Sequence, residues 1–405
     1  MSSVEATLHT YRTRLAHGGN SSPVLNPTRS TTPIATAHAH GLPIIDISAF
    51  LDPRASLQAR QTTAAAINAA CVDYGFFYLT GHGIPLATLD EVIDLAREFF
   101  ALDDAEKNAI KRYDAGGPEG GDGARGYQGL GENVTGGLQD MQEAVDWYRP
   151  WAGATTAPLD GGEGGVPTLQ GANLWPARPE KLKDVYTAYI ARVKDVGAAL
   201  VHAMGVALQL GPPDTDAAVD TSTQDERVFV RNCEQSFWVM RMIGYPPLPT
   251  AQHTPASSTS HSTDTDTSPD TDVSQFSCGA HTDYGCVTLL HTDATPGALQ
   301  VQLKDGTWLS ADPVRGAFVV NIGDMIERWT NGLWRSTLHR VVHRGDAYRV
   351  SVPFFYEPAF DAVVAPLRKC VRDSGREAMH AGSTYGEHLL TKVFSNFYYS
   401  KRTDW

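Results

Sequence analysis

The run GAHTDYG near the middle of the chain places an imidazole and a carboxylate on alternate positions, at His281 and Asp283. In an extended strand, residues two apart point to the same face and lie roughly 6.5–7 Å apart along the chain. Both side chains could therefore reach one cation. The chemistry that this pair predicts is metal ligation, and a complete site needs at least one more ligand.

A third ligand is available at His339, in STLHRVVHRG, on a segment that we expect to form a neighbouring strand. Two histidines and one carboxylate that leave the opposite face of the metal open form the facial triad of non-haem Fe(II) oxygenases. Zinc could occupy the same ligands. The choice between the two metals therefore depends on what the open positions have to bind.

Arg349 and Ser351, in YRVSVPFFYEP, share one face of a later strand. An arginine presents a planar fork that matches a carboxylate, and a serine adds a hydroxyl donor. A buried guanidinium beside a metal is costly unless an anion meets it. Tyr245, in IGYPP, could supply another donor. These residues predict a co-substrate that carries a carboxylate.

Secondary-structure patterns indicate which elements position these residues. In the first half we expect strands at 42–48 and 75–84, helices at about 54–73, after Pro85 and at about 179–210, and mostly loop over 114–171. In the second half, short β-rich segments lie at 227–231, 236–245, 276–290, 298–303, 317–322, 337–343 and 347–356. Such a succession predicts a sandwich or barrel. We therefore predict an α+β fold with a mainly β core: a double-stranded β-helix (jelly-roll) barrel with a supporting helical layer.

The predicted organisation is a disordered tail at 1–40 and a single oxygenase domain at 41–405. Within it we place N-terminal strands, helices and a Gly-rich loop at 41–210, the jelly-roll core at 227–360, and a C-terminal helix (about 384–395) and tail at 361–405. Residues 250–274 are 13 of 25 Ser or Thr. Such a segment buries too little apolar surface to offset its ordering entropy, so we predict a flexible insertion in the core.

The bulk composition limits the class of partner and the compartment. The chain has 405 residues, with 33 basic against 46 acidic ones and a net charge of −13. That balance argues against binding to nucleic acid or an anionic membrane. Five scattered cysteines without a CxxC motif suggest a reducing compartment. We expect a cytoplasmic monomer or weak dimer; a mitochondrial presequence is a second interpretation of residues 1–40.

The HTD run, the histidine in S-x-x-H-R-V and the R-x-S motif together resemble the iron(II)/2-oxoglutarate-dependent dioxygenases, in the isopenicillin N synthase-like branch. The likeness covers about residues 41–397, and LPIIDIS, GFFYLTGHGIP, RGYQG, NLWP and NIGD follow in the family's order. The resemblance implies that His281, Asp283 and His339 bind iron. It also implies that Arg349, Ser351 and Tyr245 hold the far carboxylate of 2-oxoglutarate. Ile243 departs from many plant members, which carry Asn at that position.

The activity implied by the resemblance is oxidation of an unactivated C–H bond of a small molecule, in secondary metabolism. Fe(II), 2-oxoglutarate and O₂ take part, with ascorbate as a possible reductant, and succinate and CO₂ are released. Hydroxylation is the usual outcome, while desaturation and ring rearrangement also occur. The alternatives are an isopenicillin N synthase-type oxidase without co-substrate, an ethylene-forming member, and a non-catalytic ligand-sensing protein on the same fold.

Four further residues are candidates for substrate binding. Arg241 lies four residues before Tyr245 and so points inward on the same strand, where it would suit a polar or acidic substrate or pair with a structural carboxylate. We expect Arg125 and Tyr127 on a loop over the barrel mouth. Phe355 shares the inward parity of Ser351. The substrate itself is not predicted.

Overall fold

The core consists of two β-sheets. The computed structural model describes residues 37–39, 41–114, 121–135, 138–151, 169–211, 224–248 and 276–393. The larger sheet runs in the order β1 (Ala37–Ala39), β2 (Leu42–Asp46), β3 (Phe76–Thr80), β13 (Phe318–Ile322), β10 (Val287–Thr292), β15 (Arg349–Tyr356), β8 (Val239–Tyr245), β7 (Glu143–Tyr148) and β4 (Gly126–Gln128). The smaller sheet runs β12 (Trp308–Ser310), β11 (Leu299–Gln302), β14 (His339–Val341) and β9 (Cys278–His281). Side chains of both sheets line one cavity, so the sheets face each other across it.

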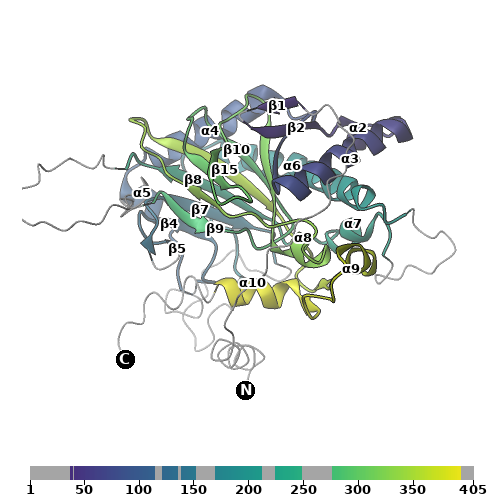
Figure 1. Ribbon diagram of the computed structural model, residues 1–405. Coiled ribbons are helices and arrows are strands. Elements are labelled where there is room, and N and C mark those ends of the chain that lie inside the picture. Colours follow the sequence, from purple (N-terminus) through teal and green to yellow (C-terminus); the bar gives the residue numbers. More distant parts are fainter. Residues whose placement is uncertain are drawn as a thin grey trace, which may run out of the picture.

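Helices and short strand pairs complete the fold. The helices are α2 (Ser48–Leu51), α3 (Leu57–Asp73), α4 (Leu86–Phe100), α5 (Asp104–Asn108), α6 (Leu182–Ala207), α7 (Val228–Asn232), α8 (Asp324–Trp329), α9 (Arg368–Ser374) and α10 (Tyr385–Val393). Two short pairs join β5 (Val134–Thr135) to β6 (Leu138–Gln139), and β16 (Val363–Val364) to β17 (Ser383–Thr384). Figure 1 shows α3, α4 and α6, in purple and teal, across the strands from α10, in yellow.

The period-two pattern of β15 explains why the large sheet has one helix-covered face and one cavity face. Val350, Val352 and Phe354 are fully buried and belong to the apolar cluster that includes α4 and α6. The alternate residues Arg349, Ser351, Pro353 and Phe355 line the cavity instead. Because successive side chains of a strand point to opposite faces, one sequence serves both the core and the site.

Helix α6 packs on β10 and β15 of this sheet and on the helices α3, α4 and α7. Its buried face repeats at helical spacing and includes Leu182, Tyr186, Tyr189, Val193, Val196, Leu200 and Met204. At Gly197 the helix approaches β15 so closely that a Cβ would lie 2.7 Å from the ring of Tyr356. A glycine is therefore needed there for the helix to pack on the strand.

Two sequence-based assignments were wrong. The predicted strand at 227–231 is helix α7, in which Val228 and Phe229 are buried and Phe229 packs on Trp329. Most described residues of 114–171 lie outside helices and strands, as expected, but β4 and β7 within this segment extend the large sheet. The predicted strand at 276–290 is two strands, β9 and β10, in different sheets.

The predicted strands at 42–48 and 75–84 correspond to β2 and β3, and the predicted helices at about 54–73, 179–210 and 384–395 correspond to α3, α6 and α10. The mainly β core with a helical layer is confirmed. The expected tail at 1–40, apart from 37–39, and the expected insertion at 250–274 lie outside the described residues. Among the described residues, no helix is long and apolar enough to cross a membrane.

Candidate metal centre and its cavity

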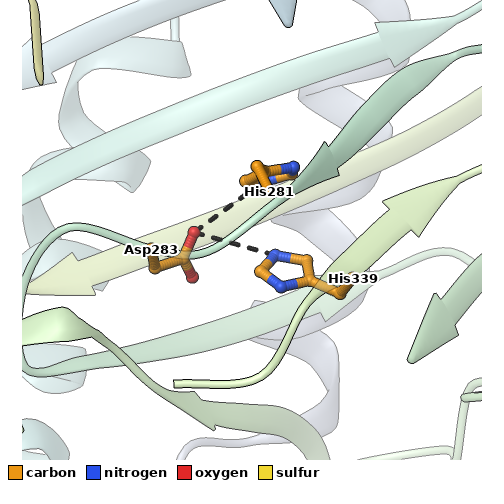
Figure 2. Close-up of side chains that lie close together, drawn as sticks. All are labelled: His281, Asp283 and His339. Carbon is orange, nitrogen blue, oxygen red and sulfur yellow. Dashed lines mark ion pairs between the residues drawn. The ribbon is translucent and has the colours of Figure 1, made fainter. Parts of the chain in front are cut away.

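His281, Asp283 and His339 come together at one end of the cavity. His281 ends β9, His339 begins β14, and the two are paired in the antiparallel register of the small sheet. Asp283 lies just beyond β9, so the strand assumed for the whole HTD run ends earlier. Its Oδ1 is 3.8 Å from His281 Nε2 and 3.7 Å from His339 Nε2. One ligand atom from each residue lies within 4.8 Å of the others (Figure 2), a spacing that one metal ion could bridge.

Hydrogen bonds orient the carboxylate of Asp283 toward the two imidazoles. Oδ2 accepts from the side chain of Asn321 at 2.6 Å and from the hydroxyl of Thr288. Both donors therefore engage one oxygen and leave Oδ1, the atom nearest both histidines, available. Neither Asn321 nor Thr288 could be assigned this role from the sequence, because each meets Asp283 only through the pairing of distant strands.

Both imidazoles are held in the tautomer that a metal requires. Nδ1 of His281 lies 2.7 Å from the carbonyl of Gly279, and Nδ1 of His339 lies 3.1 Å from the carbonyl of Thr337. A carbonyl only accepts, so each Nδ1 carries the hydrogen. Each Nε2 then presents its lone pair toward Asp283. Fixing the ligand ring through its other nitrogen is typical of metal-bound histidines.

Asp283 is held in its charged form. Burial alone would raise its pKa, but the positive charge of protonated His339 and His281 and the hydrogen bonds from Asn321 and Thr288 lower the pKa below its ordinary value. Two imidazole nitrogens, which bind a metal in their neutral form, and one buried carboxylate form a donor set that suits a divalent transition metal. The residues present therefore fit the ferrous ion of the facial triad.

Arg349 lies in the same cavity with its charge unpaired. The residue is 2 % exposed, and within the described structure its Nε and Nη1 have no hydrogen-bond partner. The guanidinium lies 4.8 Å from the ring centre of Tyr245, its partner in the β8–β15 register, and Ser351 lines the cavity two residues along. An uncompensated buried guanidinium is strongly unfavourable. This geometry fits a ligand carboxylate.

The cavity that joins these groups has a volume of about 110 Å³. Apolar side chains from both sheets form much of its lining: Phe76, Leu290, Leu299, Val341, Pro353 and Phe355. Phe355 thus lies where its parity predicted. Arg241, from β8, and Gln142, just before β7, also reach the cavity. Gln142 was not identified from the sequence, because the β7–β8 pairing joins segments about a hundred residues apart.

The expectation that Arg125 and Tyr127 cover the barrel mouth is wrong. Neither lines the cavity. Tyr127 lies in β4, packs on Phe99 of α4 and donates to Glu143. Arg125 is 2 % exposed and donates to Asp122, to Asn173 and to the carbonyls of Leu169 and Arg149. Their hydrogen-bonding groups are engaged within the fold, so both residues stabilise it.

Asp324 connects the metal-ligand turn to the C-terminal helix. Its backbone N–H donates to the carbonyl of Asp283 at 2.8 Å. Its carboxylate pairs with Lys392 at 3.1 Å and His388 at 3.5 Å, both on α10. Asp324 was expected to support the site or to form a turn. It supports the backbone of Asp283 and fixes α10 at the same time.

A second buried carboxyl group, Glu357, lies behind the same turn. Its Oε2 accepts from the backbone N–H of Cys286, and a Cβ at Gly285 would lie 1.0 Å from that oxygen. Only a glycine therefore fits at 285. Burial, with a smaller contribution from Asp283, raises the pKa of Glu357 to about 8.

The comparisons with known proteins cover most of the chain. Residues 42–178 match the family model described as non-haem dioxygenase in morphine synthesis N-terminal, and residues 233–358 match the model of the 2OG-Fe(II) oxygenase superfamily. The homoarginine-6-hydroxylase of Glycine max is 39% identical over 88% of this chain and 97% of its own length. A homoarginine-6-hydroxylase of Arabidopsis thaliana is 38% identical, with the same coverage.

Solved structures share the fold. The full-length Neurospora crassa T7H in complex with alpha-KG superposes with a TM-score of 0.66 at 23% identity, covering 87% of this chain and 95% of that one. A putative 2OG-Fe(II) oxygenase from Caulobacter crescentus gives a TM-score of 0.65 at 25% identity, covering 87% and 98%. The resemblance inferred from the motifs is confirmed, as are Fe(II) and 2-oxoglutarate as cofactors. The chain belongs to the 2OG-Fe(II) oxygenase superfamily and is a dioxygenase that oxidises a small molecule.

Proposed function

We propose that His281 and His339 bind the ferrous ion through Nε2 and Asp283 through Oδ1, and that Arg349, Ser351 and Tyr245 hold the far carboxylate of 2-oxoglutarate. The observation that carries this assignment is the unpaired, 2 % exposed guanidinium of Arg349 in the cavity that also holds the three metal-ligating side chains. Such a group requires an anion. A dicarboxylate that reaches from a metal to Arg349 meets that requirement.

When bound, iron and 2-oxoglutarate supply the oxidation by O₂ that releases succinate and CO₂. The chain's own residues orient these groups. Asn321 and Thr288 fix the carboxylate of Asp283, and the carbonyls of Gly279 and Thr337 fix the two rings. The apolar lining of the cavity limits the access of water to the reacting carbon.

The substrate that we propose is a basic amino acid of the homoarginine type, hydroxylated on a side-chain carbon. Four relatives, 34% to 39% identical over at least 89% of their own lengths, carry the name homoarginine-6-hydroxylase. The polar residues Arg241 and Gln142, in a cavity otherwise lined largely by apolar groups, are consistent with a polar substrate. Desaturation and ring rearrangement are alternative outcomes at the same site.

Other features complete the proposal. The two facing sheets are consistent with a double-stranded β-helix, or jelly roll. Residues 41–405 would form one oxygenase domain, because β2 and β3 from the N-terminal part pair into the same sheet as β13. The five cysteines are free thiols, which suits a reducing, cytoplasmic compartment. We further propose that the protein is a monomer or weak dimer and that it binds neither nucleic acid nor membranes. Ascorbate would act as an accessory reductant.

The test is succinate formation by the purified protein with Fe(II), O₂, 2-oxoglutarate and L-homoarginine. We expect succinate and hydroxylated homoarginine in equal amounts, and loss of both in Asp283→Ala. Thr292→Val, on the same strand as Thr288 but hydrogen-bonded to the carbonyl of Val350, is the control and should stay active. Substrate oxidation without succinate would instead indicate an oxidase that needs no co-substrate. Ethylene in the headspace would indicate an ethylene-forming enzyme.

If Asp283→Ala retains full turnover, the metal assignment is wrong. If the wild type forms succinate with other small molecules but not with homoarginine, only the substrate proposal is wrong. A protein that binds neither Fe(II) nor 2-oxoglutarate would point to the non-catalytic alternative.

A further inference from the structure

Buried polar atoms without a hydrogen-bond partner gather on the wall formed by β4, β7 and β8, although two of them, Asp146 Oδ1 and Arg241 Nε, form an ion pair with each other. Among the described residues, these atoms include Gln128 Oε1, Gln142 Oε1, Asp146 Oδ1, and Nε and Nη2 of Arg241. Each unsatisfied buried group costs about 1–3 kcal/mol. Native proteins contain few of them, and a cluster calls for a partner that completes it.

The register of the sheet places these residues on one face. Asp146 pairs with Arg241 across β7 and β8, and Ala144 pairs with both Ile243 and Gln128. Side chains at alternate positions of a strand share a face, so Gln142 lies on the same side as Asp146. Arg241 and Gln142 line the cavity together with the three metal-ligating residues.

Asp146 and Gln128 hold the guanidinium of Arg241 in place. Gln128 Nε2 donates to Asp146 Oδ2 at 2.6 Å, and Asp146 Oδ1 lies 3.4 Å from Arg241 Nε as an ion pair. Burial would lower the pKa of Arg241, but Asp146 more than offsets this effect and the pKa is raised. Asp146 therefore holds the guanidinium in place and keeps it charged, while Nη2 of Arg241 still has no hydrogen-bond partner.

The unpaired atoms define the chemistry of a ligand. Nη2 of Arg241 requires an acceptor, and a carboxylate is the best geometric match for a guanidinium. Gln142 Oε1 is an acceptor and requires an N–H donor. An α-amino acid offers a carboxylate and an ammonium on neighbouring atoms. An apolar substrate would leave both protein groups buried and unpaired.

We propose that Arg241 and Gln142 bind the head group of an α-amino acid substrate: Arg241 the carboxylate, and Gln142 Oε1 the ammonium. Asp146 and Gln128 are positioning residues that act through Arg241. This inference rests on the proposed function, because it requires the cavity to be the substrate site of the oxygenase. It places the head group on the β7–β8 wall and leaves the side chain to extend toward the metal-ligating residues.

The experiment is calorimetric titration of the nickel(II)-loaded protein with 2-oxoglutarate under anaerobic conditions, followed by one of three probes. These are L-homoarginine, its carboxamide, and the decarboxylated amine 5-aminopentylguanidine. In the wild type, we expect the two probes without a carboxylate to bind at least about 30-fold more weakly, as expected when one partner of a buried charge pair is removed. This comparison requires no variant.

The variants assign that preference to residues. In Arg241→Gln, homoarginine should bind at least about 30-fold more weakly, while the amine changes less than about threefold. Asp146→Asn should weaken homoarginine binding about tenfold and leave the amine unchanged, because only the position of Arg241 is disturbed. Arg241→Lys retains the charge and tests the result if the Gln variant unfolds. Arg231→Gln, an arginine paired with Asp225 outside the cavity, is the matched control and should bind like the wild type.

Three results would overturn the inference. One is a wild type that binds homoarginine no better than 5-aminopentylguanidine, including a wild type that binds neither. Another is retention of the carboxylate preference in both Arg241 variants. The third is a drop in 2-oxoglutarate affinity in Arg241→Gln without any change for homoarginine, which would assign Arg241 to the co-substrate. Failure of the proposed function looks different, because the wild type would then give no heat with 2-oxoglutarate itself.

Discussion

Replacing Arg349 by Met should change ligand binding and stability in opposite directions. The substitution keeps an unbranched, flexible chain of similar length and removes the charge, together with Nε and Nη1, the two donors that have no hydrogen-bond partner in the described structure. In the ligand-free protein, relief of two buried unsatisfied donors is worth about 2–6 kcal/mol. Loss of the guanidinium contact with Tyr245, at 4.8 Å, costs about 1–2 kcal/mol. The net expectation is a ligand-free protein that is more stable by up to about 5 kcal/mol.

The corresponding shift in melting temperature follows from chain length. Unfolding entropy is about 2.1 cal/mol/K per residue, so for 405 residues each kcal/mol moves the melting temperature by about 1 °C. We therefore expect Arg349→Met to melt up to about 5 °C above the wild type without ligand. With 2-oxoglutarate at about 100 times its Kd, the wild type gains about 2.7 kcal/mol, or about 3 °C. The variant should gain almost nothing.

The assay is differential scanning fluorimetry of both proteins with and without 2-oxoglutarate, in the presence of nickel(II). Affinity for 2-oxoglutarate should fall by about 2–5 kcal/mol, roughly 30- to 4000-fold. A variant that melts below the wild type without ligand, yet is still protected by 2-oxoglutarate, would refute the argument. Arg349 would then be a structural residue that has a partner in the free protein.

Three further predictions test other parts of the site. Thr288→Val removes one of the two hydrogen bonds that orient Asp283, so metal affinity measured by calorimetry should fall about 10- to 100-fold. The control Thr292→Val should keep the affinity of the wild type. Equal affinities of the two variants would show that Thr288 does not support the metal site. Because burial raises the pKa of Glu357 from 4.5 to about 8, the folded chain binds a proton that the unfolded chain releases, so stability should fall as pH rises between these values. Melting curves of metal-free Glu357→Gln should lack this decline, and identical pH slopes would contradict the assignment. Arg125→Gln should be about 3–5 kcal/mol less stable in denaturant titrations, because its buried partners lose a charged donor. The folded protein should keep its KM for homoarginine. A raised KM at unchanged stability would show that Arg125 binds the substrate.

Residues that belong to local patterns could be predicted from the sequence. Arg349 and Ser351 are two residues apart, as are His281 and Asp283, and this spacing predicts that each pair lies on one face. Each pair does lie together at the cavity, even though Asp283 lies beyond the end of β9. Helices α4 and α6 could be predicted as well, because their apolar residues recur at helical spacing. Local periodicity is enough when one face of an element decides its packing.

Residues whose role depends on pairing between distant segments could not be predicted. Thr288 and Asn321 meet Asp283 because β10 pairs with β13, and Gln142 reaches the cavity because β7 pairs with β8. The run EAVDWY was noticed as acidic and aromatic, but its Gly-rich surroundings suggested a loop, so its strand was missed. The β-branched run at α7 was misread because its apolar residues satisfy both a strand period and one turn of a helix.

Asp324 connects helix α10 to the metal-binding residue Asp283. One backbone hydrogen bond from this residue fixes the carbonyl of a metal-binding aspartate, and two ion pairs from its side chain fix α10. A change in how that last helix docks, for example by removal of the chain from Tyr385 onward, would therefore loosen the loop that carries Asp283. Iron retention in this enzyme should thus depend on a helix that supplies none of the three triad side chains.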